Sequence, residues 1–467
     1  MSESKSREGF VRRLGRAVDD PRPSRVAAIA VAALLFLPIA ALVLVSIANL
    51  VPDWPIMDEL FKSVQAGLIE PGFRSRSTSG RLVDTWSDCH TITIGLGDAP
   101  GTSRWSAALR SPTLGSCEYA APNIEGWANG EGLTREWEYF RYWHGTAAFS
   151  RPAIATIGLV GARIVTGWLL VAAAVGLAGS IVRRHGAMVS VALLGPFLFT
   201  TDVLDLPASL HQAWAVLAVL VMAWLGHEVV WRRVTTGRIV LISLSAGSVF
   251  VFFDLLTIPP GAWALTVVVV VLAASRRVDG VGLALIGALA VGGWAVGYAS
   301  MWVAKWVLAI PVYGYERVRT EIVYQTTFRL DGQPNYQIDL SFGAGVRRMW
   351  DVWTQHPLAW PVLFALIAMV TAAIVVRWLR STVGSKYRAA DRVIVAAPTL
   401  LPLIWFEVVR NHTQIHEFPA RSVPIAIGIL AVAIIVRLPA LNDQSSAPVP
   451  VGDATPRATS EQQSKPV

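Results

Sequence analysis

The stretch Arg410-Asn411-His412-Thr413-Gln414-Ile415-His416-Glu417-Phe418-Pro419-Ala420-Arg421 separates two strongly apolar segments, 393–409 and 422–436. It crowds histidines, arginines and a carboxylate into a loop only long enough to join two membrane spans. Ionisable groups at a membrane boundary are costly to place and commonly mark a functional site. We therefore expect this loop to form one wall of a site at a single face of a membrane.

The composition is that of a polytopic membrane protein. Of the 467 residues, 54% are hydrophobic and 15% are charged, and the mean hydropathy is +0.49, whereas a soluble domain carries about 25% charged residues. The net charge of +8 could indicate a nucleic-acid partner, but most Lys and Arg residues lie in short loops between apolar segments. That distribution is typical of cytoplasmic loops of membrane proteins. Membrane lipids, and no nucleic acid, are therefore the expected partners.

Apolar runs of about 20 residues predict an all-α integral membrane protein with about ten transmembrane helices and two long extracytoplasmic loops. The predicted spans are 26–50, 156–182, 187–203, 212–231, 239–256, 261–275, 281–303, 358–379, 392–409 and 420–437. The expected regions are a basic cytoplasmic tail (1–25), the first span (26–50), the first long loop (51–152), a transmembrane bundle (153–303), the second long loop (304–357), a further transmembrane part (358–437) and a disordered cytoplasmic tail (438–467). With a cytoplasmic N-terminus, an even number of spans returns the C-terminus to the cytoplasm.

The arginines support this topology. The predicted inner loops contain Arg-Arg pairs at 183–184, 232–233 and 276–277, whereas the short predicted outer loops 202–211 and 254–260 contain neither Lys nor Arg. The loop 410–421 is the exception, because it keeps Arg410 and Arg421 on the outer side. Because arginines are usually concentrated in cytoplasmic loops, two arginines in a short outer loop suggest a site that binds an anion. The alternative is that both arginines only contact lipid headgroups.

Other ionisable residues fall at predicted outer ends of spans. Asp254 ends the fifth span, Lys305 ends the seventh, and His412 and His416 follow the ninth. Each has a simpler explanation, since Asp254 could cap the next helix, Lys305 could extend to the interface, and the histidines could donate to helix-end carbonyls. Their shared location favours a polar cavity at the outer membrane boundary.

Cys89 and Cys117 both lie in the first long loop. A cysteine pair in one extracytoplasmic loop most often forms a disulfide, and the alternative is two unpaired thiols. No Cys/His set has the spacing of zinc ligands. No metal site is therefore expected, while a requirement for a divalent cation stays open.

A lipid-linked phosphate donor would suit such a cavity. Its polyprenyl tail would stay in the bilayer while its anionic head reached the outer surface. Arg and Lys neutralise phosphate, and His can donate a hydrogen bond or a proton to it. A nearby carboxylate could deprotonate an acceptor hydroxyl.

Three further segments carry a family resemblance together with the 410–421 loop. They are Arg141-Tyr142-Trp143-His144-Gly145, Phe253-Asp254-Leu255-Leu256-Thr257-Ile258-Pro259 and Gly297-Tyr298-Ala299-Ser300-Met301-Trp302-Val303-Ala304-Lys305-Trp306. From about residue 80 to 425 the chain resembles a largely uncharacterised family of bacterial polytopic membrane proteins associated with surface polysaccharides. That family is similar in plan to the GT-C glycosyltransferases. The resemblance implies a bacterial inner (plasma) membrane protein that uses a polyprenyl-phosphate sugar.

The resemblance also implies a catalytic Asp in the first outer loop. The family's Asp-Asn-x-Thr-Asp segment corresponds to 84–88, where Asp84 and Asp88 match its acids while Thr85 and Ser87 depart from it. Asp88 is preferred, then Asp84, with Asp53 as the rival just after the first span; alternatively these acids are solvated or cap helices. The family's Phe-Thr-Tyr-Arg reads Phe418-Pro419-Ala420-Arg421, which keeps the arginine and loses the Tyr. The other implied roles are phosphate binding by Arg421, His412, His416, Lys305 and Arg410, and sugar or acceptor binding by Asp254, Arg141, Tyr142, His144 and Asn411. A short amphipathic helix at about 136–149 is expected where the loop re-enters the membrane.

The expected activity is inverting transfer of a monosaccharide from a polyprenyl-phosphate donor to a cell-surface glycan, lipid or protein acceptor. An arabinosyltransferase and a mannosyltransferase are both open. A transporter or flippase would place charges near the bilayer midplane, which this chain does not. A non-catalytic cell-envelope assembly protein, whose outer loops bind partners, is compatible with the sequence.

Overall fold

The computed structural model describes residues 23–69, 83, 86–97, 102–134, 137–332, 338–379 and 389–436. Over these ranges the protein is all-α, as predicted, apart from a two-residue antiparallel strand pair. Most of the predicted basic tail 1–25, the predicted disordered tail 438–467 and Asp84 lie outside the described residues.

Seven of the described helices are long and apolar enough to cross a membrane. They are α2 (Pro23–Ala48), α7 (Ala147–His185), α9 (Leu210–Arg232), α10 (Thr236–Phe253), α12 (Gly280–Tyr313), α15 (Ala359–Leu379) and α19 (Ser422–Ile435) with the preceding 3₁₀ turn η3 (Phe418–Arg421). Two shorter apolar helices, α8 (Ala187–Phe199) and α11 (Pro259–Ala274), lie at two more predicted spans. The predicted span 392–409 is a broken helix, made of α16 (Ala389–Ala396), the 3₁₀ turn η2 (Ala397–Thr399) and α17 (Leu400–Val408). The chain is thus a helical membrane protein, and the number of ten spans stays a prediction.

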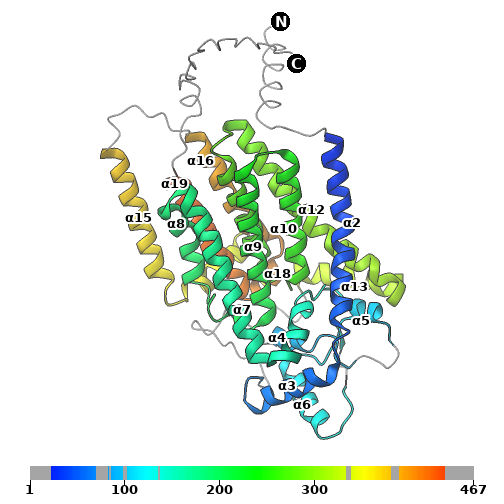
Figure 1. The fold of residues 1–467 in the computed structure, drawn as a ribbon. Coiled ribbons are helices and arrows are strands. Elements are labelled where there is room, and N and C mark those ends of the chain that lie inside the picture. The colour runs from blue at the N-terminus through cyan, green and yellow to red at the C-terminus, as the bar shows by residue number, and fades with distance from the viewer. Residues whose placement is uncertain are drawn as a thin grey trace, which may run out of the picture.

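The short elements of the long loops gather at one end of the bundle, the lower end in Figure 1. They are α3 (Asp53–Gln65), α4 (Trp86–Ile92), α5 (Arg104–Arg110), β1 (Pro112–Thr113), α6 (Cys117–Ala128), β2 (Trp137–Glu138), η1 (Leu206–Ala208), α13 (Tyr315–Asp331), α14 (Ala344–Thr354) and α18 (Arg410–Ile415). We call this end the loop end. The opposite end, with the arginine pairs of 183–184, 232–233 and 276–277, is called the arginine end.

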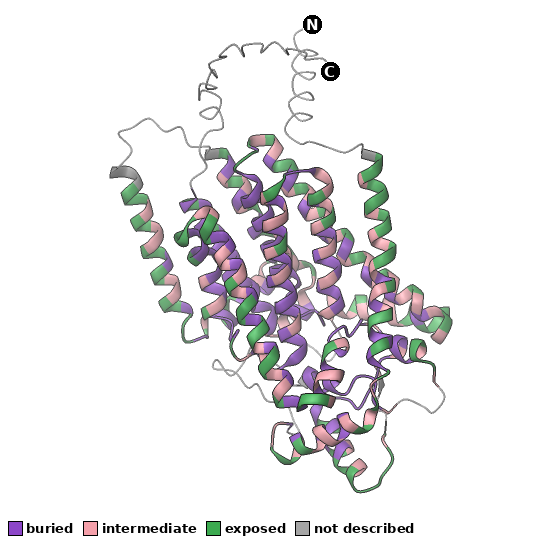
Figure 2. Cartoon of the chain, in the orientation of Figure 1, coloured by how far each residue is buried: buried purple, intermediate pink, exposed green. Residues whose placement is uncertain are grey.

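The centre of the bundle consists of helices that are apolar on all sides, as is typical of buried helices. The spans of α9 and α19 are 67% and 83% buried within the protein, and every residue of α11 from Val267 to Ala274 is at most 1% exposed. In contrast, α2 and α15 are 17% and 11% buried and flank the bundle (Figure 2). Their exposed apolar side chains suit contact with lipid.

Glycines bring α10 and α12 into backbone contact. A Cβ atom on Gly247 would overlap the carbonyl of Trp294, and one on Gly297 would overlap the carbonyl of Leu244. Small residues at such points let membrane helices pack closely. The contact fixes the part of α12 that carries Lys305 toward the loop end.

Three features differ from the sequence prediction. Helix α12 continues to Tyr313, past the predicted end at 303. The predicted amphipathic helix at 136–149 is wrong, because the segment forms β2 and turns before α7 begins at Ala147. Helix α7 bends at Gly158, which has a φ of 71°. A Cβ atom added to Gly158 would lie only 2.6 Å from Oε2 of Glu59.

Replacing Gly297 by Ala is expected to destabilise the protein by about 1–3 kcal/mol, because the methyl group forces α10 and α12 apart. Gly292→Ala is the matched control on the same helix, since nothing lies within 4 Å of its added Cβ. Thermal unfolding of both variants in detergent measures the effect. Equal melting temperatures for the two variants would contradict the close packing.

Candidate functional site

Two of the acids predicted to be catalytic are held by arginines of α7. Asp53, at the start of α3, accepts a hydrogen bond from Arg151 Nη2 at 2.7 Å. Arg151 is 2% exposed and also donates to the carbonyl oxygens of Ala48, Val51 and Ile94. This arginine therefore ties the junction of α2 and α3 to α7, and Asp53 is one of its partners.

Asp88 is buried between three helices. Its Oδ2 lies 3.0 Å from Arg163 Nη2 of α7, and its Oδ1 accepts a hydrogen bond of 2.6 Å from the backbone N–H of Leu210, the first residue of α9. A carboxylate is favourable at a helix N-terminus. Both oxygens thus serve to join α4, α7 and α9, and a catalytic role for Asp88 or Asp84 stays a prediction.

The disulfide between Cys89 and Cys117 joins α4 to α6. Residues two apart on a helix point to roughly opposite sides, so His90 faces away from Asp88. The His90 ring stacks on Tyr139, with 5.1 Å between ring centroids. His90 was not singled out from the sequence.

The segment 139–145 is fixed between the end of α10 and an interior turn of α12. The N–H of Gly145 donates to the Phe252 carbonyl at 2.7 Å, and a Cβ atom on Gly145 would overlap the Phe252 ring. Trp143 Nε1 donates to the Met301 carbonyl at 2.8 Å. In the motif 141–145, which contributed to the family resemblance, Trp143 and Gly145 therefore serve to pack this segment against α10 and α12.

Lys305 is fully buried within the protein. Its Nζ donates to the Ala108 carbonyl of α5 at 3.0 Å and lies 5.4 Å from the centroid of the Trp143 ring. It is therefore placed between α12 and the first long loop, next to the segment 139–145.

Two arginines meet at the tyrosines of this segment. The Arg141 guanidinium lies 4.1 Å above the Tyr139 ring, and its Nη1 is 3.4 Å from Glu321 Oε1 of α13. Arg329, also on α13, donates from Nη2 to the Tyr142 hydroxyl at 2.9 Å. Arg329 lies in an ordinary polar segment, so the sequence carried no signal for its role.

The loop between α10 and α11 carries Asp254 and packs against Tyr142 through Leu255 and Leu256. Its carboxylate, 3% exposed, accepts hydrogen bonds from the Thr257 N–H at 2.8 Å and from the Thr257 hydroxyl. Burial raises the pKa of Asp254 to about 7, although the hydrogen bonds from Thr257 act to lower that pKa. Leu255 and Leu256 pack with Tyr142 against an aromatic wall formed by Tyr139, Tyr298, Trp302 and Trp405.

The histidines of the 410–421 loop reach the same place. His412 Nε2 lies 3.0 Å from the Leu256 carbonyl, and since a carbonyl only accepts, Nε2 carries the proton. The His416 ring lies 4.5 Å from the His412 ring and stacks on Phe418 at 4.8 Å, measured between centroids. Burial lowers the pKa of His412 well below its ordinary value and that of His416 to about 4. Both rings are therefore neutral at pH 7.

These groups form what we call the loop-end cluster. Its members are His90, Tyr139, Arg141, Tyr142, His144, Asp254, Lys305, Arg329, His412 and His416. Burial also lowers the pKa of His90 and His144 to about 3, and a guanidinium stays charged in proteins. The permanent positive charge of the cluster consequently comes from Arg141 and Arg329 and not from its histidines.

Three other predicted site residues hold the surrounding loops. Arg410 Nη1 donates to the Leu340 carbonyl at 2.8 Å, and Asn411 Nδ2 donates to the Phe328 carbonyl at 2.6 Å. Arg421 is fully buried, and its Nη2 donates to Gln212 Oε1 of α9 at 3.0 Å. The contacts described here are all with other parts of the protein. The predicted roles of these three residues in ligand binding therefore stay predictions.

A buried His–Asp pair joins the loop after α8 to the loop after α14. His356 Nδ1 accepts from the Leu358 N–H at 3.1 Å, and Nε2 donates to Asp202 Oδ1 at 3.0 Å. Nearby, Trp353 Nε1 donates to the Thr200 hydroxyl at 2.8 Å. The sequence showed Asp202 at a span end but gave no indication of its partner.

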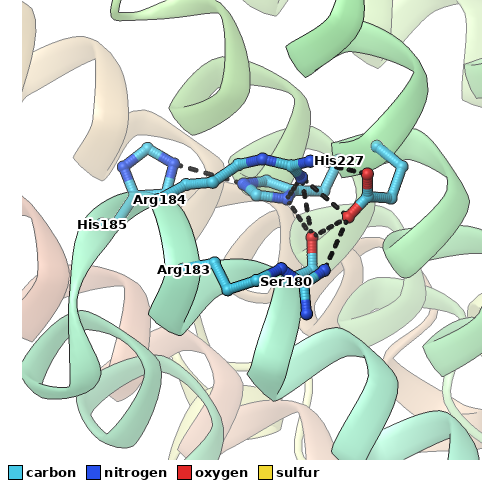
Figure 3. Close-up of polar contacts among 6 residues, drawn as sticks. Ser180, Arg183, Arg184, His185 and His227 are labelled. Carbon is cyan, nitrogen blue, oxygen red and sulfur yellow. Dashed lines mark hydrogen bonds and ion pairs between the residues drawn. The ribbon is translucent and has the colours of Figure 1, made fainter.

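A second polar network lies at the arginine end and joins α7 to α9 (Figure 3). Arg184 contacts both carboxylate oxygens of Glu228 at 2.7 Å. The Ser180 hydroxyl donates to Glu228 at 2.7 Å, so His227 Nδ1, 2.7 Å from the same hydroxyl, donates to it. His227 Nε2 then accepts from His185 Nε2 at 3.2 Å. The buried polar groups satisfy one another, which indicates a structural role.

Comparison with protein-family models, with curated proteins and with solved structures finds no match. The GT-C resemblance of the sequence therefore stays an expectation, and the geometry of the loop-end cluster is the basis for a functional proposal. Among the described residues, no group of three or more His, Cys, Asp or Glu side chains is placed to hold a metal ion.

The raised pKa of Asp254 predicts a pH-dependent stability. Its pKa rises from 3.8 to about 7 on folding. The stability that the protonated carboxyl group contributes to the folded state is therefore fully present below about pH 3.8 and is lost as the pH rises through 7. The Asp254→Asn side chain cannot ionise. The free energy of unfolding of this variant should therefore rise relative to that of the wild type between pH 4 and 7, on the order of 1 kcal/mol per pH unit. Melting temperatures of both proteins from pH 4 to 8 test this, because the histidine contributions cancel in the difference. A constant difference would contradict it.

Asp88→Asn is expected to lower stability by roughly 3 kcal/mol, because it leaves the largely buried Arg163 side chain, 15% exposed, without its anionic partner. Asp58→Asn, on the exposed side of α3, is the control, with a side chain 48% exposed. Thermal unfolding and sugar transfer are measured together. An unchanged melting temperature with loss of transfer would instead assign Asp88 the catalytic role that the sequence suggested.

Proposed function

We propose that the protein is an integral membrane glycosyltransferase of the inner (plasma) membrane, which transfers a monosaccharide from a polyprenyl-phosphate donor on the extracytoplasmic side. One observation carries the proposal: guanidinium, imidazole and phenol groups from distant segments gather at one end of a membrane bundle, around the loop that also carries the buried carboxylate of Asp254. A substrate with a lipid tail and a phosphosugar head suits that position, because its two parts require the bilayer and a polar site.

Arg141 and Arg329 would hold the donor phosphate. Guanidinium groups bind phosphate oxygens through paired N–H donors, and their charge would stabilise the phosphate monoester that leaves when the sugar is transferred. Both are already positioned by Tyr139, Tyr142 and Glu321. The neutral His412 and His416 would add hydrogen bonds rather than charge.

Asp254 would act as the general base. A carboxylate with a pKa near the working pH takes up a proton efficiently. In the proposed step the acceptor hydroxyl gives its proton to Asp254, and its oxygen forms a bond to the sugar C1. The bond from C1 to the phosphate oxygen breaks, and the electron pair leaves with polyprenyl phosphate. Because Asp254 is 3% exposed, the acceptor must displace neighbouring side chains to reach it.

A transporter is the second candidate. Discontinuous helices are typical of secondary transporters, and here α7 bends at Gly158 while the segment 389–408 is interrupted by η2. Accumulation of a labelled substrate in proteoliposomes, without a covalent product, would favour transport over transfer.

Arg329→Gln is expected to reduce transfer by roughly a hundredfold or more, the usual loss when one preorganised transition-state donor is removed. The protein in nanodiscs is incubated with a panel of polyprenyl-phosphate sugars and membrane acceptors, and release of polyprenyl phosphate is measured. Arg319→Gln on the same helix, 61% exposed and paired with Glu316, is the matched control. Equal rates for the two variants would remove Arg329 from the site, and no release by the wild type from any donor would oppose the proposed activity.

A further inference from the structure

A polar groove lies beside the loop-end cluster. It has a volume of about 390 Å³ and is lined by Asp339, by Arg347, Arg348 and Asp351 of α14 and by Gln414 of α18, with a few apolar neighbours. Small-molecule sites commonly have volumes of about 300–1,000 Å³. The groove is therefore large enough for a ligand of a few sugar rings.

The charges that line the groove balance. Arg347 Nη2 lies 3.4 Å from Asp339 Oδ2 and 2.9 Å from the Ser341 hydroxyl, and Arg348 Nη2 lies 3.2 Å from Glu417 Oε1. A phosphate would meet the carboxylates, and a cation would meet the guanidinium groups. A neutral ligand rich in hydroxyl groups could both donate to the carboxylates and accept from the arginines.

The walls of the groove are held by hydrogen bonds from the 407–417 region. The Gln414 side-chain amide accepts from the Asp339 N–H and donates to the Asp339 carbonyl, both at 2.8 Å. Glu407 accepts from the N–H groups of Gly343 and Val346, at 3.0 and 3.3 Å, at the start of α14. A preformed site loses less entropy when a ligand binds.

The same short helix serves both sites. Helix α18 contributes His412 to the loop-end cluster and Gln414 to the groove, and Glu417, the partner of Arg348, directly follows His416. Because residues two apart on a helix face roughly opposite sides, the groove and the cluster lie on the two sides of this six-residue helix.

We propose that this groove binds an uncharged glycan segment of the acceptor, while the end of that glycan extends to the loop-end cluster. The inference rests on the proposed glycosyl transfer and names the acceptor class for it. Acceptor binding in the groove needs neither the donor phosphate nor Asp254, so it can be measured without the reaction.

The test uses the full chain in nanodiscs without donor. Diazirine-labelled mannotriose, arabinofuranotriose and maltotriose are photo-crosslinked to it, and the attachment sites are mapped by mass spectrometry. We expect crosslinks within 338–351 and at 414–415 for at least one probe, displaced by the same unlabelled sugar. Asp351→Asn and Arg347→Gln should each weaken binding about tenfold, as expected for loss of one charged hydrogen bond. Asp58→Asn and Arg319→Gln are the matched surface controls and should bind as the wild type does.

Several results would overturn the inference. They are crosslinks only outside the groove, no crosslink with any probe, unchanged binding by both groove variants, or displacement of the sugars by phosphatidylglycerol vesicles, which would indicate a lipid headgroup site. Donor turnover alongside any of these would leave the proposed transfer intact. Sugar binding in the groove without turnover of any donor would instead oppose the transferase proposal and keep the groove as a glycan site.

Discussion

The hydrogen bond from His412 Nε2 to the Leu256 carbonyl joins two loops that lie 156 residues apart in the chain. A buried backbone carbonyl needs a hydrogen-bond donor, because leaving it unpaired costs about as much free energy as losing a hydrogen bond. A neutral imidazole meets that need without burying a charge. The loop of Leu256 also holds Asp254, and the helix of His412 also holds Gln414. This contact therefore helps to fix the proposed base relative to the helix that lines the proposed acceptor groove.

Buried ionisable groups at the loop end fall into two kinds. Asp88 pairs with Arg163 of another helix and Asp202 pairs with His356 of another loop, so both acids join separate parts of the chain. Within the described part of the chain, Asp254 instead has local hydrogen bonds to Thr257, and the next two residues, Leu255 and Leu256, pack against aromatic side chains. Burying a carboxylate without a cation is unfavourable, and its raised pKa reflects that cost. Such a group is a better candidate for proton transfer than a carboxylate held in an ion pair.

The sequence predicted the helical membrane architecture, because each long span is a continuous apolar run and the bilayer requires about 20 such residues. It also placed Asp254, His412 and His416 at a common boundary, since alternating helices put every second loop at the same end. The sequence did not show which charged residues pair with each other over long distances along the chain. Nothing near Asp88 in the sequence indicates Arg163, and nothing in the polar helix α13 distinguishes Arg329 from its exposed neighbour Arg319. Hydropathy also did not reveal the break at Pro398, because η2 and its flanking helices remain apolar.

The electrostatics of the cluster link donor binding to the state of the base in the proposed reaction. A phosphate that entered beside Asp254 without cations would raise the pKa of that carboxyl further and keep it protonated, because like charges oppose ionisation. Arg141 and Arg329 offset the charge of the phosphate, so Asp254 can ionise while the donor is bound. The histidines could not do this, since burial keeps them neutral at pH 7. The two arginines would therefore be needed twice, to hold the donor and to keep the base able to accept a proton.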